Sequence, residues 1–106
     1  MAGLPAENMA MTRSVRVTHN KLLSDPEVAA EYLSTALEEA DSSVVLMALR
    51  NIAEAQEGGI AGLAARTKLG RESMYKMLSE EGNPKLSSFT QVIRGLGLHL
   101  KVQTHA

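Results

Sequence analysis

The chain has 106 residues, the size of one ordinary domain, and its content of 44% apolar and 22% charged residues excludes a disordered protein. It has no cysteine, which excludes disulfides, thiolate metal sites and cysteine nucleophiles. Three prolines and eight glycines exclude a collagen-like chain, and no apolar run reaches the length of a membrane span.

The composition and the order of the charges indicate a helical protein with two different surfaces. Only 3% of the residues are aromatic, and alanine, leucine and methionine, which favour helices, fill the apolar positions instead. The net charge of −1 is the sum of +2 over residues 1–24, −7 over residues 25–57 and +4 over residues 58–106. This separation indicates two faces with different partners, although chance segregation of solvated charges is the alternative.

The first part of the chain is expected to be a loose N-terminal leader, residues 1–21, followed by one domain over residues 22–106. Ser24 and Glu27 have the spacing of a capping box, and Pro26 suits the first turn of a helix whose apolar stripe runs to Leu37. Asp41 is the expected N-cap of a second helix, which should end at the glycine pair 58–59.

The elements that follow are short. Two helices are expected over residues 60–67 and 71–78, joined by a tight turn at residues 68–70. A last helix should begin at a Ser87 cap and stop at Gly97. Apolar residues then alternate with polar ones over residues 98–103, which predicts a short C-terminal β-strand. The only other strand candidate is the segment 12–19.

Catalysis and metal binding find little support in the sequence. His19, His99 and His105 are too scattered for a metal site. The acids at positions 38, 39 and 41 fit a helix end and an N-cap better than an acid–base pair. The glycines at 58, 59 and 62 lack the Lys-Ser/Thr of a phosphate-binding loop. We therefore expect no enzyme, no cofactor and no metal.

The region 60–78 carries the strongest functional signal. Leu63, Leu69, Met74 and Met77 are spaced to face a shared core. Long polar and charged side chains should then face outward from the second helix and suit a DNA major groove: Arg71, Glu72, Ser73, Tyr75 and Lys76. Phosphate contacts are expected from Arg66, Lys68 and Lys85. The alternative is an ordinary helical hairpin with a solvated outer face.

Residues 63–78, followed by Gly82-Asn83-Pro84, resemble the lambda-repressor-like (Xre-type) helix-turn-helix. More narrowly, the chain resembles the addiction-module antidote family, the antitoxins of the host-inhibition-of-growth type, over residues 22–103. The resemblance implies a five-helix domain and a cytoplasmic protein that represses its own operon and neutralises a basic RelE/ParE-like toxin. Two positions depart from the family: Lys68 stands where glycine is usual, and Gly70 where a serine cap is usual.

The expected partners are operator DNA, the toxin and a second copy of the chain. The acidic helices should supply the toxin surface through Glu27, Glu31, Glu38 and Glu39, unless these acids only solvate a helix face. The C-terminal strand should pair across a homodimer and bury Leu98, Leu100 and Val102. It could instead pair with residues 15–18 of its own chain, or with the toxin.

Two other functions stay open at this stage. One is a stand-alone Xre-type repressor without a toxin. The other is a protein-binding adaptor that has lost DNA binding, which the near-neutral total charge and Glu72 on the outward face both allow.

Overall fold

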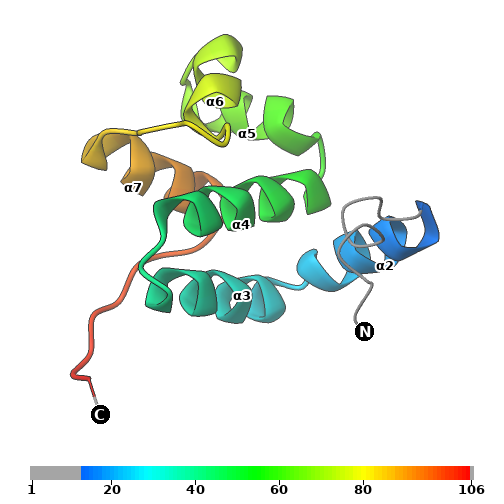
Figure 1. Ribbon diagram of the computed structural model, residues 1–106. Helices are drawn as coiled ribbons and strands as arrows, with labels where there is room; N and C mark the ends of the chain where they lie inside the picture. Colours follow the sequence, from blue (N-terminus) through cyan, green and yellow to red (C-terminus); the bar gives the residue numbers. More distant parts are fainter. Residues whose placement is uncertain (1–12, 106) are drawn as a thin grey trace.

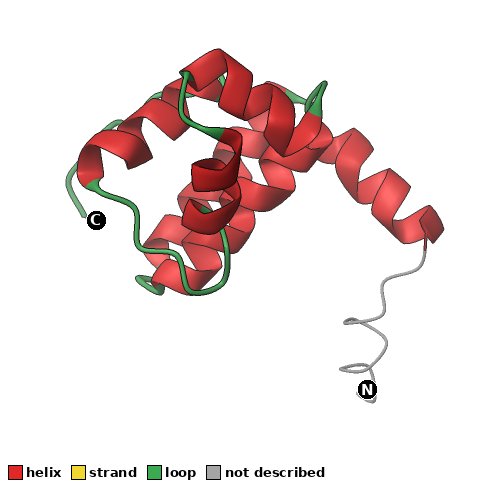
Figure 2. Ribbon diagram, turned by 90° about the horizontal axis from the view of Figure 1, so that it is seen from above, coloured by secondary structure: helices red, strands yellow, loops and turns green. Residues whose placement is uncertain are grey.

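The computed structural model describes residues 13–105, and this part of the chain is helical. Its helices are α2 (Arg13–Leu23), α3 (Pro26–Glu38), α4 (Ser42–Ala55), α5 (Gly59–Thr67), α6 (Arg71–Met77) and α7 (Leu86–Gly95). The prediction of a mainly helical fold is confirmed. The described residues form six helices rather than five, and they contain no strand (Figure 2), so the predicted C-terminal β-strand does not form within the single chain.

Helix α2 occupies part of the segment for which a loose leader, or a strand, was considered. It runs without a break across residue 21, while residues 1–12 lie outside the described part of the chain. Leu23 at its end is buried, and the ring of His19 meets the ring of Tyr32 edge-on, with their centroids 5.9 Å apart. Because residues 15–18 are helical, they cannot pair as a strand with the C-terminal segment.

Helix α3 begins one residue later than the capping-box spacing predicts. Asp25, not Ser24, is the N-cap: its backbone is extended, and its carboxylate accepts a hydrogen bond of 2.9 Å from the N–H of Glu27. The hydroxyl of Ser24 donates instead to the carbonyl of Lys21, at 2.6 Å, and so closes the end of α2. Pro26 takes the first helical position, where a missing N–H costs nothing.

The predicted N-cap is confirmed for α4 and wrong for α7. Asp41 caps α4 as predicted, and it accepts hydrogen bonds from the hydroxyl of Ser43 (2.8 Å) and from its N–H (3.0 Å). Helix α7 begins at Leu86, so the cap position belongs to Lys85, which makes no side-chain capping bond. Ser87 lies inside the first turn.

Helix α4 is the centre of the molecule (Figure 1). It contacts α2 and α3 on one side and α5 on the other. Helices α6 and α7 both contact α5. The largest fully buried side chains come from α4 to α7 and the residue after α6: Leu49, Ile52, Leu63, Met74, Leu78, Val92 and Ile93. This arrangement places the acidic α3 on the opposite side of α4 from the basic α5 and α6.

Candidate functional site

The turn between α5 and α6 is held by backbone geometry and one hydroxyl. Lys68 has φ 64° and ψ 13°, the left-handed conformation expected where glycine is usual. The hydroxyl of Thr67 donates to the carbonyl of Leu63 (3.0 Å) and accepts from the N–H of Leu69 (3.4 Å). Gly70 precedes α6 without a side-chain cap. The turn therefore fixes where α6 starts without the serine that the position usually carries.

Helix α6 has one buried side and one exposed side. Met74 and, just past the helix, Leu78 are almost completely buried. The five side chains expected to face outward are all exposed: Arg71, Glu72, Ser73, Tyr75 and Lys76. Tyr75 retains 48% of its surface, which is high for an aromatic side chain that has no partner in a core. The exposed side of α6 thus combines two cations, hydroxyls and an aromatic ring.

A residue that the sequence did not point to anchors α6 in place. The guanidinium of Arg50 on α4 donates to the carbonyl of Leu78, the residue that caps the C-terminus of α6. A carbonyl at a helix C-terminus has no intrahelical partner and carries partial negative charge, so a cation satisfies it well. The signal in the sequence was that Arg50 is the only basic residue between positions 25 and 57.

Lys76 and Lys85 lie at the same hollow, although they are in different elements. This hollow has a volume of about 670 Å³ and separates α6 from the first turn of α7, with the loop 79–85 as its third wall. Ser73 and Ser88 also line it, as does Glu81. Two ammonium groups with nearby hydroxyls are suited to a phosphate oxygen. Ser88 was missed by the sequence analysis because its neighbours in space are distant in sequence.

Arg66 differs from Lys76 and Lys85, because its guanidinium forms hydrogen bonds within the protein. Its Nε donates to the carbonyl of Gly95 (3.1 Å), and its two terminal nitrogens donate to the side chain of Gln56 (2.9 Å) and to the carbonyl of Glu57 (3.5 Å). Gln56 in turn donates to the carbonyl of Leu96 (2.9 Å). Arg66 therefore ties together the C-terminal ends of α4 and α7, which speaks against the phosphate contact expected from it.

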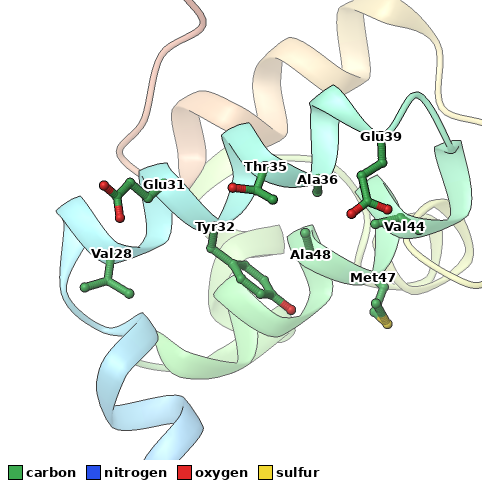
Figure 3. Close-up of a pocket in the computed structure, with 9 residues that line it drawn as sticks. All are labelled: Val28, Glu31, Tyr32, Thr35, Ala36, Glu39, Val44, Met47 and Ala48. Carbon is green, nitrogen blue, oxygen red and sulfur yellow. The ribbon is translucent and has the colours of Figure 1, made fainter.

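A second hollow, of about 380 Å³, lies between α3 and α4 (Figure 3). Of the four acids expected to bind a toxin, Glu31 and Glu39 line it, whereas Glu27 and Glu38 are exposed but do not. The other lining residues are mostly apolar: Val28, Tyr32, Thr35, Ala36, Val44, Met47 and Ala48. The structure thus brings two of the four acids together around an apolar floor. We call this hollow the α3–α4 groove.

The C-terminal segment is extended but unpaired. Leu98 donates its N–H to the carbonyl of Ile93 (3.1 Å), and no backbone hydrogen bond joins residues 99–105 to another described residue. The segment runs along α3, with which it encloses a hollow of about 460 Å³. Leu98 is already half-buried there, whereas Leu100 and Val102 keep 43% and 95% of their surface.

None of the described helices is both long and apolar enough to cross a membrane. No three histidine, aspartate or glutamate side chains in the described part of the chain are grouped so that they could hold a metal ion.

One comparison with known proteins identifies a family for this chain. The family model described as "Probable addiction module antidote protein" matches residues 14–104. A protein of Haemophilus influenzae, described as uncharacterized, is 34% identical over 82 residues, which are 77% of this chain and 81% of that relative. No solved structure matches the chain.

Proposed function

The chain belongs to the family of probable addiction module antidote proteins, and we propose that it is an antitoxin that also represses its own operon. In this proposal α5 and α6 form an Xre-type helix-turn-helix, and α6 enters the major groove of the operator. The toxin would be a RelE/ParE-like protein of the host-inhibition-of-growth type, encoded by the neighbouring gene.

The observation that carries the DNA-binding part is the exposed side of α6 together with the hollow beside it. Arg71 and Lys76 are free to reach guanine edges, and Tyr75 lies exposed between them on the same helix. Lys76 and Lys85 converge on the hollow at the start of α7, where a phosphate of the same DNA strand would find two cations. Arg66 is not included, because its donors are used within the protein.

Operator binding tests this part directly. We expect Arg71→Ala and Lys76→Ala each to weaken specific binding by roughly 1–3 kcal/mol in fluorescence anisotropy with DNA from upstream of the gene. Lys85→Ala should weaken binding to all sequences and lower the salt slope by about one. Lys21→Ala, which removes an equal charge from the distant α2, is the control. Unchanged operator binding by both α6 variants would show that α6 does not read DNA.

Operator binding, combined with a measurement of binding to the product of the neighbouring gene, separates the alternative functions. A protein that binds the neighbouring gene's product but no operator DNA is an adaptor, for which Glu72 on the exposed side of α6 is the supporting observation. A protein that binds the operator but no neighbouring product is a stand-alone repressor.

We also propose that the protein is a homodimer whose C-terminal segments pair. A helix as short as α6 covers few base pairs, so two copies on half-sites about one DNA turn apart would raise affinity. The backbone groups of residues 99–103 have no backbone hydrogen-bond partner among the described residues, and antiparallel pairing of two copies would satisfy them. This pairing would bury more of the exposed surface of Leu100 and Val102 than of Leu98, which is already half-buried.

A further inference from the structure

The α3–α4 groove has its negative charges at its two ends and its apolar surface between them. Glu31 on α3 and Glu39, the C-cap of α3, are eight residues apart, which corresponds to about two helical turns, or roughly 12 Å. Figure 3 shows Tyr32 and Ala36 between them, facing Ala48 of α4. Among the residues whose side chains the structure describes, no lysine or arginine lines the groove.

The apolar surface of the groove is partly open to solvent and held in shape. Val28 keeps 36% and Met47 keeps 42% of its surface exposed to solvent, so neither side chain is buried in the core. The hydroxyl of Tyr32 accepts a hydrogen bond of 2.8 Å from the side-chain amide of Asn51, and its ring meets His19 edge-on. A partner would therefore meet a floor that is already ordered, which lowers the entropy cost of binding.

The charges of the groove select among possible partners. A nucleic acid would be repelled by Glu31 and Glu39, since both carry charge of the same sign as its phosphates. A second copy of this chain, packed groove to groove about a twofold axis, would bring four of these carboxylates together. A basic protein meets neither penalty.

We infer that the α3–α4 groove is the toxin-binding site, and that it takes an amphipathic helix of the toxin. This helix carries apolar side chains between two lysines or arginines that stand about two turns apart. It lays its apolar face on Val28, Tyr32 and Met47, and its two cations meet Glu31 and Glu39 at the ends of the groove. The inference rests on the proposed antitoxin function, and it removes Glu27 and Glu38 from the central contact.

The first experiment compares two double variants, each of which neutralises two acids of α3 or its C-cap, and which differ only in the positions of those acids. The full-length chain and the purified product of the neighbouring gene are mixed in a stopped-flow instrument at low and high salt. We expect E31Q/E39Q to associate about tenfold more slowly than the wild type at low ionic strength, with a smaller difference at high salt. The matched pair E27Q/E38Q should change the rate less than about twofold.

A second pair of variants tests the apolar floor. Met47→Ser should raise the dissociation rate about tenfold or more, since a side chain central to an interface acts mainly on dissociation. Leu22→Ser, at an apolar position of α2 outside the groove that is more exposed than Met47 (56% against 42%), should leave that rate unchanged. Melting temperatures of all variants, followed by circular dichroism, verify that they are folded.

The outcomes distinguish this inference from the proposed function. If the wild type binds the neighbouring product and the two glutamine pairs behave alike, the antitoxin function stands and the groove is not its site. If Met47→Ser changes the sedimentation of the isolated protein, the groove is covered by a second copy and the inference is overturned. If the wild type does not bind the product at all, both the function and the inference are rejected.

Discussion

Replacing Lys68 by glycine should raise the stability of the fold and at the same time weaken its binding to DNA. Lys68 has φ 64°, and the left-handed conformation costs a non-glycine residue roughly 1–2 kcal/mol. Glycine removes this cost but gains entropy in the unfolded chain, which offsets roughly 0.4–1 kcal/mol. The net gain is about 1 kcal/mol in the free energy of unfolding, which corresponds to a rise of roughly 4–8 °C in Tm for a domain of this size.

The expected loss of DNA binding follows from the position of the side chain. Lys68 is exposed in the turn that leads into α6, so its ammonium group is free to contact phosphate. Lys68→Gly should therefore lower operator affinity and reduce the salt slope by about one.

Urea unfolding and fluorescence anisotropy measure the two effects separately. Ala40→Gly is the matched control, because Ala40 also has a positive φ, 56°, but lies between α3 and α4. It should gain stability to a similar extent and leave DNA binding unchanged. A Lys68→Gly variant that is less stable than the wild type would refute the reasoning on backbone strain. An unchanged salt slope would refute the phosphate contact.

Three further predictions concern the packing, the pH dependence and the C-terminal segment. Gly95→Ala should destabilise the fold by roughly 1–3 kcal/mol in urea unfolding, because the added Cβ would lie 2.5 Å from Cγ2 of Thr67. Thr67→Ser in the same chain should restore part of that loss, and equal losses with and without it would contradict the clash. Hydrogen bonds from the hydroxyl and the N–H of Ser43 lower the pKa of Asp41 below 3.8, so its carboxylate stabilises the fold above about pH 4 and loses that effect as the pH falls through the lowered pKa. The Tm difference between the wild type and Asp41→Asn should accordingly shrink on acidification below pH 4, and a constant difference would show that Asp41 is not the group responsible. Deletion of residues 100–106 should give a monomer with unchanged helical circular dichroism and much weaker operator binding, whereas a truncated chain that still sediments as a dimer would exclude this interface.

The sequence by itself determined the features that depend on neighbours in the chain. The ranges of α3 to α6 follow from apolar spacing, and Asp41 was recognisable as a cap because a capping carboxylate bonds to an N–H only two residues away. The outward residues of α6 followed in the same way from the helical repeat, whereas the left-handed Lys68 was expected from the family resemblance, which places it where glycine is usual. The family was also apparent at this level, because its motifs are local.

Only the tertiary structure decided the features that join distant parts of the chain. The alternation over residues 98–103 predicts a strand, but a strand exists only when a second segment supplies its hydrogen bonds, and none of the described residues does. The sequence predicted a phosphate contact for Arg66, whereas in the fold α7 places the carbonyl of Gly95 within hydrogen-bond distance of its Nε. The four acids of α3 and its C-cap were equivalent in the sequence, and the packing of α4 placed only Glu31 and Glu39 at a groove. In each case the presence or absence of a hydrogen bond or contact between elements far apart in the chain decided the outcome, not the local pattern.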